Sequence, residues 1–202
     1  MTAFLYALGG YLAGSIPFGV IVSRAMSAPD PRTYGSGNIG ATNVLRSGHR
    51  VAALLTLAGD AGKGWAAVLA ARLAGASVDL LAIVAVAAFL GHVFPVWLGF
   101  RGGKGVATAA GVLIALDWTL GLAVIVAWLI IAVATRYSSL AAVGAALFAP
   151  VAAWYLAGVG PVLGAVVAMS VVLLARHRDN IGKLLRGEES RIGEKKTAAS
   201  VN

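Results

Sequence analysis

Three glycine-rich polar segments interrupt a hydrophobic sequence, and each offers residue types that bind anions. The first segment, residues 35–46, reads GSGNIGATNVLR and includes Ser36 and Arg46. Glycines allow several backbone N–H groups to converge on one ligand, and the planar guanidinium group of arginine matches the oxygens of a phosphate. This pattern predicts a phosphate-binding loop; the alternative is an ordinary loop between two helices.

The same segment contains the G-x-G-x-x-G spacing of dinucleotide-binding loops. That fingerprint requires a strand before the glycines and a βαβ unit around them. Here Pro29 and Pro31 break the preceding segment, and Asp60, which would have to serve as the ribose-binding acid, lies inside a hydrophobic stretch. A dinucleotide-binding domain is therefore excluded, and the small polar side chains of the loop remain as its chemistry.

The second segment, residues 91–108, reads GHVFPVWLGFRGGKGVAT and places Lys104 among three glycines. It lacks the spacing of a Walker A loop, but glycines that lead into a helix would present N–H groups, a helix N-terminus and an ammonium group to one anion. Two alternatives stay open. Lys104 could be an interfacial lysine that extends toward the membrane surface, and His92 could serve helix packing as readily as catalysis.

The third segment, residues 176–191, reads RHRDNIGKLLRGEESR. His177 and Asn180 are three residues apart and would share one face of a helix. A basic amphipathic tail on anionic lipid is the alternative.

Asp60 and Lys63 are also three residues apart, within a hydrophobic stretch. We expect them to form a structural ion pair, with a role in positioning the substrate or the polar segments as the second possibility.

The composition indicates which elements must position these segments. Of the 202 residues, 59% are hydrophobic and 12% are charged, and the mean hydropathy is +0.87. Soluble domains are about 45–50% apolar and about 25% charged, so a soluble enzyme, a secreted disulfide scaffold and a disordered chain are excluded. The lack of cysteine removes thiol nucleophiles and cysteine metal sites. The sequence predicts an all-α, polytopic integral membrane protein with a single membrane-embedded domain, residues 1–202, and a basic cytoplasmic tail over about 187–202.

Seven transmembrane helices are predicted from the apolar stretches. A span needs about 20 largely apolar residues, and the stretches are 3–23, 51–73, 79–97, 104–117, 118–135, 138–157 and 161–176. Five spans are the alternative, with 51–73 or 104–117 partly in the interface. Every basic residue except Lys63 and Arg72 falls on segments that are cytoplasmic when the N-terminus is outside. The positive-inside rule therefore predicts that orientation, a cytoplasmic C-terminus and all three polar segments at the cytoplasmic face.

Together the three segments resemble the signature motifs of the bacterial acyl-phosphate:glycerol-3-phosphate acyltransferase family, the PlsY type. The resemblance covers nearly the whole chain, including the order and spacing of the motifs and the D-x-x-K-G that begins at Asp60. It implies transfer of a fatty acyl group from acyl phosphate to the 1-hydroxyl of sn-glycerol 3-phosphate. The products are 1-acylglycerol 3-phosphate (lysophosphatidate) and phosphate, in the first step of phospholipid synthesis. It also implies a multi-pass protein of the bacterial inner membrane, with these two substrates and membrane lipids as partners.

The resemblance also implies a role for individual residues. The family's essential Ser and Arg correspond to Ser36 and Arg46, its His and Asn to His177 and Asn180, its glycerol-phosphate-binding glycine loop to residues 102–105, and its glutamate to Glu189, with Glu188 as a neighbouring alternative. The predicted catalytic residues are Ser36, Arg46, Lys104, His177 and Asn180. The predicted substrate-binding residues are Gly37, Asn38, Thr42, Asn43, Gly102, Gly103, Gly105 and Glu189.

The chemistry of the segments fits this activity. Acyl phosphate has a good leaving group, so the main tasks of the site are to hold two anions and to align a hydroxyl with a carbonyl. Positioning supplies up to about 7–11 kcal/mol, and one oxyanion donor about 2.7–4 kcal/mol. We expect Arg46 and Lys104 to hold the phosphates and Ser36 to hydrogen-bond the acyl phosphate or the oxyanion. The proton acceptor stays open between His177, His92 and a substrate phosphate, and direct transfer is preferred to an acyl-Ser36 intermediate.

Neither a cofactor nor a metal is predicted. The sequence has no H-x-x-x-x-D motif, no G-x-S-x-G elbow and no cluster of histidines and carboxylates with metal-ligand spacing. No nucleic-acid partner is expected. The main alternative function is a membrane transporter for a phosphorylated or anionic solute, which would place polar groups near the bilayer midplane and not at one face. A lipid-binding scaffold without catalysis is a second alternative.

Overall fold

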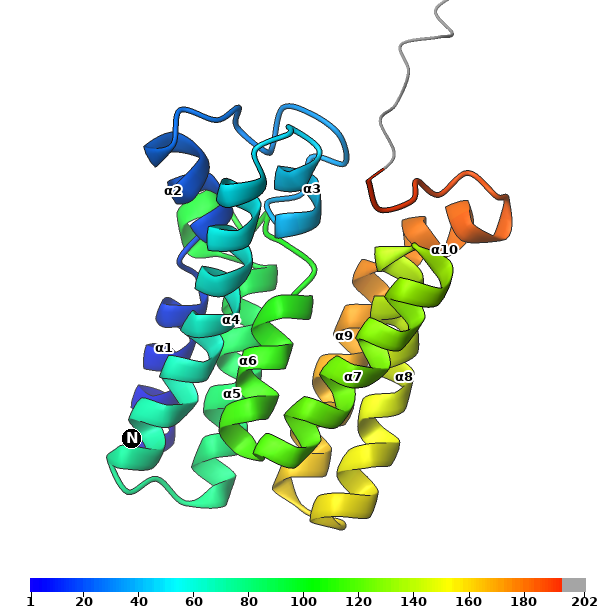
Figure 1. Cartoon of the computed structure of the whole chain (residues 1–202). Coiled ribbons are helices and arrows are strands. Elements are labelled where there is room, and N and C mark those ends of the chain that lie inside the picture. Colours follow the sequence, from blue (N-terminus) through cyan, green and yellow to red (C-terminus); the bar gives the residue numbers. More distant parts are fainter. Residues whose placement is uncertain (194–202) are drawn as a thin grey trace, which may run out of the picture.

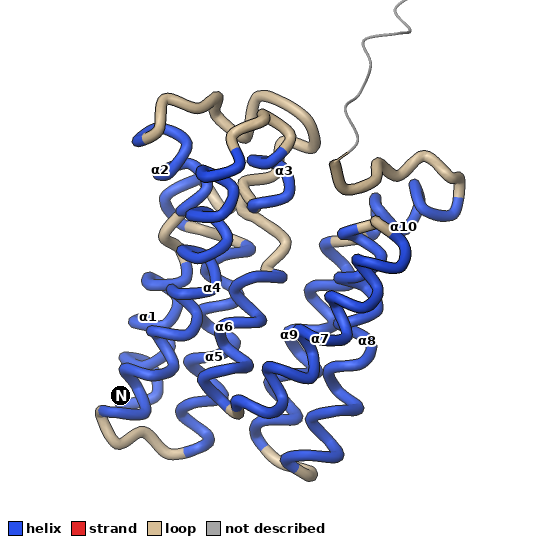
Figure 2. The backbone as a smooth tube through the Cα atoms, viewed as in Figure 1, coloured by secondary structure: helices blue, strands red, loops and turns tan. Residues whose placement is uncertain are grey.

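The computed structural model describes residues 1–193, and all regular secondary structure in that range is helical (Figure 2). The long helices are α1 (Thr2–Gly14), α4 (Arg50–Leu73), α5 (Val78–Val93), α6 (Val106–Leu116), α7 (Trp118–Thr135), α8 (Ser138–Ala157) and α9 (Pro161–Arg176). The short ones are α2 (Phe18–Ala25), α3 (Ala41–Leu45), the 3-10 turn η1 (Val96–Leu98) and α10 (Arg178–Leu185). The all-α prediction is confirmed. Of the predicted basic tail, residues 194–202 lie outside the described part of the chain.

The long helices lie side by side in two neighbouring groups (Figure 1). In the first group, α1 packs on α5 and α4 packs on α6. The second group consists of α7, α8 and α9, and it joins the first through contacts of α6 with α7 and of α5 with α9. The short helices α2, α3 and α10 lie at one end of this bundle, opposite the end where α1 begins (Figure 1). The polar segments therefore gather at one end of the molecule.

Four helical stretches are long and apolar enough to cross a membrane, namely Thr2–Ala25, Val78–Leu98, Trp118–Thr135 and Ser138–Ala157. Helices α9 and α10 qualify together as a fifth, although they bend by 56° at their junction. Helix α6 is apolar but has only 11 residues, and α4 carries Asp60, Lys63 and Arg72. Within residues 1–193, length and composition thus support an all-helical membrane protein with four to five candidate spans.

The first predicted span, 3–23, is not one continuous helix. Helix α1 ends at Gly14, and α2 begins at Phe18, directly after Pro17. Proline has no N–H to donate and disfavours helical backbone in the residue before it, here Ile16. The helix therefore breaks, and the Ile16 carbonyl accepts a hydrogen bond from Lys63 Nζ at 2.7 Å. The α-helix of the predicted span 79–97 similarly ends at Val93, ahead of a second proline.

Small residues determine how closely the helices approach. A Cβ on Gly14 would meet the backbone of Ala88 in α5, and a Cβ on Gly111 of α6 would meet the backbone of Ala61 in α4. Close contact at glycine is typical of membrane helices, whose association depends on van der Waals packing. The main buried core extends between α5, α6, α8 and α9, and its side chains include Phe89. This packing fixes the helix ends that carry the polar segments.

Candidate active site

The first polar segment folds around the buried side chain of Asn43, which lies in α3. Asn43 Nδ2 donates to the carbonyl oxygens of Pro31 and Asn38 at 2.7 and 2.9 Å, and Asn43 Oδ1 accepts from the Ser36 N–H at 3.0 Å. Gly35 has a φ of +60°, and a Cβ there would meet Asn43 Oδ1, so glycine is required. The polar atoms of Asn43 are thus occupied within the loop, and its role in binding substrate stays a prediction.

The remaining predicted residues of the first segment lie around the buried Asn43 side chain. Gly37 has a φ of +65°, and Asn38 Oδ1 accepts from the N–H of Gly40 at 2.9 Å, so both shape the loop. The side chains of Ser36 and Arg46 are exposed. Within residues 1–193, the Ser36 hydroxyl makes no hydrogen bond, which leaves it available to a ligand.

The second polar segment folds back over the end of α5. The N–H groups of Gly102 and Gly103 donate to the carbonyls of Val93 and His92 at 3.2 and 3.1 Å. These two donors are therefore used within the fold, contrary to the expectation that they face an anion. A Cβ on Gly103 would overlap the ring of His92. The glycines thus serve close packing on α5, and this packing places the half-buried Lys104 just before α6.

The third polar segment begins where α9 ends and the chain bends by 56° into α10. His177 lies buried at this bend, and its Nδ1 donates to the Leu173 carbonyl at 2.9 Å. Because a carbonyl can only accept, Nδ1 carries the proton and Nε2 holds the free lone pair of the neutral ring. Burial lowers the pKa of His177 to about 4, so the ring is neutral at pH 7. His177 is also the N-cap of α10, since its carbonyl accepts from the Ile181 N–H at 2.9 Å, and Asn180 lies in the first turn of that helix.

Lys104 connects the second and third segments. Its ammonium group donates to Oδ1 of Asn180, whose Nδ2 donates in turn to Oε1 of Glu189 at 2.8 Å. The hydroxyl of Ser139 donates to the same Glu189 oxygen at 2.9 Å. This chain of hydrogen bonds spans the loop before α6, the start of α8 and the segment after α10. Three predicted residues, Lys104, Asn180 and Glu189, are thereby brought into direct contact.

The first segment joins the others through two contacts. Arg46 Nη2 donates to the hydroxyl of Ser190 at 2.6 Å. Thr42 Oγ1 lies 3.2 Å from Ser138 Oγ, within hydrogen-bonding distance. All three polar segments therefore form one cluster, which we call the polar cluster, at the end of the bundle that carries α2, α3 and α10 (Figure 1).

Positive charge dominates the polar cluster. Burial lowers the pKa of the Lys104 ammonium, the positive charges of Arg46, Arg176 and Lys183 lower it further, and the carboxylate of Glu189 opposes the change. An excess of cations over carboxylates favours an anionic ligand. No group of three or more His, Asp or Glu side chains in residues 1–193 is arranged to hold a metal ion.

Three serines of the polar cluster are not among the residues predicted from the sequence. Ser138 and Ser139 begin α8, and Ser190 follows α10. The available signal is a pair of hydroxyl residues at the basic end of a predicted span, beside Arg136. That signal does not identify Glu189 as the partner of Ser139, because 50 residues separate the two and only the packing of α8 brings them together.

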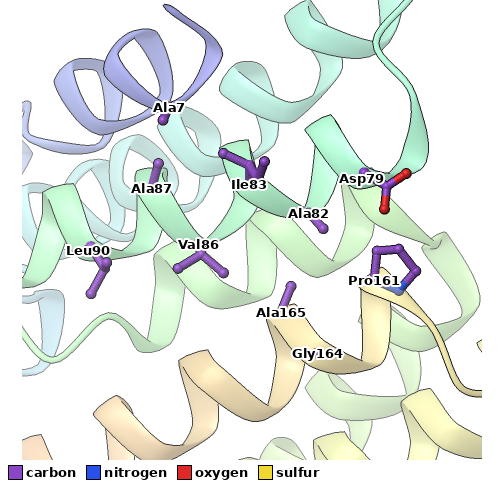
Figure 3. Close-up of a pocket in the computed structure, with 10 residues that line it drawn as sticks. All are labelled: Ala7, Asp79, Ala82, Ile83, Val86, Ala87, Leu90, Pro161, Gly164 and Ala165. Atoms are coloured by element: carbon purple, nitrogen blue, oxygen red, sulfur yellow. The ribbon is translucent and has the colours of Figure 1, made fainter. Parts of the chain in front are cut away.

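An apolar groove lies on the surface of α5, between α1 and α9 (Figure 3). It has a volume of about 540 Å³, and its lining includes Ala7, Ile83, Val86, Ala87, Leu90 and Ala165, with Asp79 and Pro161 near one end. From Asp79 to Leu90 the helix rises by about 16 Å, at 1.5 Å per residue. Leu90 is two residues before His92, so the groove runs along α5 toward the end that carries the polar cluster.

Known proteins match the chain along nearly its whole length. The family model described as glycerol-3-phosphate acyltransferase matches residues 4–187. The glycerol-3-phosphate acyltransferase of Burkholderia lata is 60% identical over 202 residues, which covers 99% of this chain and 95% of the relative. The glycerol-3-phosphate acyltransferase of Ralstonia nicotianae is 59% identical over 196 residues, which covers 95% of each chain.

The fold agrees with crystal structures of PlsY, described as an integral membrane glycerol 3-phosphate acyltransferase. The glycerol 3-phosphate form matches with a TM-score of 0.89 and the lysophosphatidic acid form with 0.87. Each is 36% identical in sequence, and the match covers 96% of both chains. Sequence motifs, helical architecture and relatives agree, and the chain belongs to the glycerol-3-phosphate acyltransferase family of the PlsY type, as a multi-pass integral membrane enzyme of bacteria.

Proposed function

We propose that this glycerol-3-phosphate acyltransferase takes its acyl group from acyl phosphate and transfers it to the 1-hydroxyl of sn-glycerol 3-phosphate. The products are 1-acylglycerol 3-phosphate and inorganic phosphate. The observation that carries the proposal is the cationic polar cluster, in which Lys104 contacts Asn180 of the third segment and Arg46 of the first segment contacts Ser190. The PlsY relative has a glycerol 3-phosphate form and a lysophosphatidic acid form, which correspond to the acceptor and the product.

The cationic groups hold the two phosphates. Arg46 and Lys104 are two cations of the cluster that come from different segments, so together they suit two anions bound side by side. The free hydroxyl of Ser36 donates to the acyl phosphate or to the developing oxyanion. Asn180, held by Lys104 and Glu189, orients a substrate phosphate or hydroxyl.

The loop residues support these groups. Gly37, Asn38 and Asn43 give the first segment its shape, and Thr42 ties that segment to α8. Gly102, Gly103 and Gly105 allow the second segment to pack closely on α5, which fixes Lys104.

The proton of the attacking hydroxyl goes to a phosphate oxygen of a substrate. A phosphate monoester has a pKa of about 6, whereas burial lowers the pKa of His177 to about 4, so the phosphate is the stronger base. His177 then acts through the lone pair on Nε2, as a hydrogen-bond acceptor that orients the hydroxyl. No base contacts Ser36 among residues 1–193, which favours direct transfer over an acyl-Ser36 intermediate.

The acyl chain lies in the apolar groove between α1, α5 and α9. This groove is open along α5 from Asp79 to Leu90 (Figure 3). Leu90 is two residues before His92, whose carbonyl accepts from the Gly103 N–H of the second polar segment. A substrate phosphate in the polar cluster and an alkyl chain in the groove would place the acyl carbonyl near the end of α5. Such an arrangement accounts for an active site at a membrane surface.

The seven long helices each cross the membrane, with the N-terminus outside and the polar cluster at the cytoplasmic face of the inner membrane. α4 and α6 are included because they pack side by side within the bundle, although α4 is charged and α6 is short. The charges of α4 are compatible with a span because Asp60 and Lys63 are buried and paired with each other.

Purified protein in detergent tests the reaction. With acyl phosphate, glycerol 3-phosphate and a chelator present, we expect equimolar lysophosphatidate and phosphate, and no acyl label left on the protein. Arg46→Ala should reduce kcat/KM at least 100-fold. The control Arg50→Ala, which removes an exposed arginine four residues further on, should stay within about threefold. Product from acyl-CoA but not from acyl phosphate would contradict the proposed donor, and an acylated Ser36 would contradict direct transfer.

A further inference from the structure

A charged network lies buried beneath the polar cluster, among α1, α4 and α5. Its members are Asp60, Lys63 and His92, whose residue exposures are 1%, 6% and 3%. Lys63 Nζ contacts Asp60 Oδ1 at 2.7 Å, the Ile16 carbonyl at 2.7 Å and His92 Nδ1 at 2.9 Å. The ion pair expected from the spacing of Asp60 and Lys63 is therefore present, and a histidine and the break between α1 and α2 join it.

The geometry uses all the donors of Lys63. An ammonium group has three N–H donors and no acceptor, and the three contacts use one donor each. Nδ1 of His92 therefore accepts a hydrogen bond, which fixes the orientation of the imidazole ring. None of the three side chains reaches the polar cluster through a hydrogen bond within residues 1–193, so the network does not itself bind substrate.

The network is connected to the polar cluster through the loop Gly102–Lys104, which packs on His92. The backbone carbonyl of His92 accepts the Gly103 N–H at 3.1 Å, and its ring occupies the position that a Cβ on Gly103 would take. A rotation of the ring would either push into the loop or leave it unsupported. Lys104, the next residue, donates to Asn180 in the polar cluster. The orientation of His92 is thus coupled to the position of the Lys104 ammonium.

We propose that Asp60, Lys63 and His92 are positioning residues that hold the loop Gly102–Lys104 in the conformation that presents the Lys104 ammonium to the phosphate of glycerol 3-phosphate. This inference rests on the proposed function, in which Lys104 holds a substrate phosphate. Ionic groups are costly to bury, and a well-packed apolar substitute is often as stable. The network is therefore explained better by the orientation that it imposes on His92 than by stability.

The substitution Lys63→Met tests the proposal, because it keeps the length of the side chain and removes the three donors. We expect the KM for glycerol 3-phosphate to rise at least tenfold, with kcat and the KM for acyl phosphate within about threefold of wild type. Asp60→Asn/Lys63→Met removes both buried charges together and should show the same pattern if the single variant fails to fold. Arg72→Met is the matched control on the same helix, where Arg72 Nη2 donates to the Leu116 carbonyl away from the polar cluster.

A binding measurement separates this inference from the choice of acyl donor. Glycerol 3-phosphate alone should raise the melting temperature of the wild-type protein and of Arg72→Met, and should raise it much less for Lys63→Met and the double variant. Equal shifts in all four proteins, or a loss of kcat with unchanged KM for glycerol 3-phosphate, would overturn the positioning role. If acyl phosphate failed as a donor, the shifts in melting temperature caused by glycerol 3-phosphate would still be expected. That failure would contradict the proposed function but not the positioning role.

Discussion

Glu188 and Glu189 are adjacent in the sequence but have different surroundings. Glu189 accepts hydrogen bonds from Asn180 and Ser139 inside the polar cluster, at 2.8 and 2.9 Å. Glu188 pairs with Arg186 at 2.8 Å, and both of these side chains are exposed. An exposed pair contributes little free energy, whereas the carboxylate of Glu189 raises the pKa of the neighbouring Lys104 against the effect of burial. The geometry thus favours Glu189 as the functional glutamate of the pair.

The substitution Glu189→Gln should shift the pH dependence of the enzyme. It removes the charge that raises the pKa of Lys104, so this pKa falls and the ammonium group is lost at a lower pH. We expect the alkaline limb of the kcat/KM profile to move to lower pH, and kcat/KM at pH 8 to fall about tenfold. Glu188→Gln removes the same charge one residue away and should leave the profile unchanged. Equal displacement by both substitutions, or by neither, would contradict the assignment.

Residue types alone predict which side chains could be functional better than they predict which residues those side chains contact. Arg46 and Lys104 are recognisable because cations among glycines suit anions, and the structure places both in one cluster. Asn43 has the same small polar character as its neighbours in the loop, and only the folded backbone shows that it is buried and occupied. His92 could not be assigned from the sequence, because its role depends on Lys63, which lies 29 residues away.

At the scale of elements, the contact between α4 and α6 depends on a glycine. A Cβ on Gly64 would lie 2.6 Å from the backbone oxygen of Thr108 in α6, whereas a Cβ on Gly62, two residues earlier in α4, would meet nothing within 4 Å. Both positions are helical, so alanine gains about 0.8–1 kcal/mol of helix propensity at either one. Steric overlap distinguishes the two positions.

Gly64→Ala should therefore destabilise the protein, and Gly62→Ala should not. Overpacking costs about 1–3 kcal/mol, so we expect Gly64→Ala to lower the melting temperature in detergent and Gly62→Ala to leave it unchanged or slightly raised. Thermal unfolding followed by circular dichroism measures the difference. A melting temperature for Gly64→Ala that equals or exceeds that of Gly62→Ala would show that α4 and α6 are not in close contact.

The helices themselves are largely predictable, because an apolar stretch of sufficient length has few alternatives in a membrane. The predicted segments 118–135, 138–157 and 161–176 coincide with α7, α8 and α9. The bounds fail at two prolines, Pro17 between α1 and α2 and Pro95 after α5, whereas Pro150 lies inside α8 without ending it. Apolarity continues through these prolines, so hydropathy alone does not locate the breaks.

For the whole molecule, the sequence does not predict which distant segments contact one another. The positive charges predict that the three polar segments lie on one side of the membrane, but they do not indicate that Thr42 lies beside Ser138 or Arg46 beside Ser190. Those contacts depend on how the two groups of helices pack, which a hydropathy pattern does not encode. The cluster at one end of the bundle is therefore a consequence of the complete fold (Figure 1).

Cysteine labelling tests the proposed seven-span orientation, and the natural lack of cysteine makes single substitutions clean reporters. Thr33 precedes the first polar segment, and Val159 lies between α8 and α9; both are exposed. Ala74 follows α4 and reports whether that charged helix crosses the membrane. A membrane-impermeant maleimide should label Val159→Cys and Ala74→Cys in right-side-out vesicles, and Thr33→Cys in inverted vesicles. Labelling of Ala74→Cys from the same side as Thr33→Cys would place α4 in the interface, and labelling of Val159→Cys together with Thr33→Cys would contradict the proposed orientation.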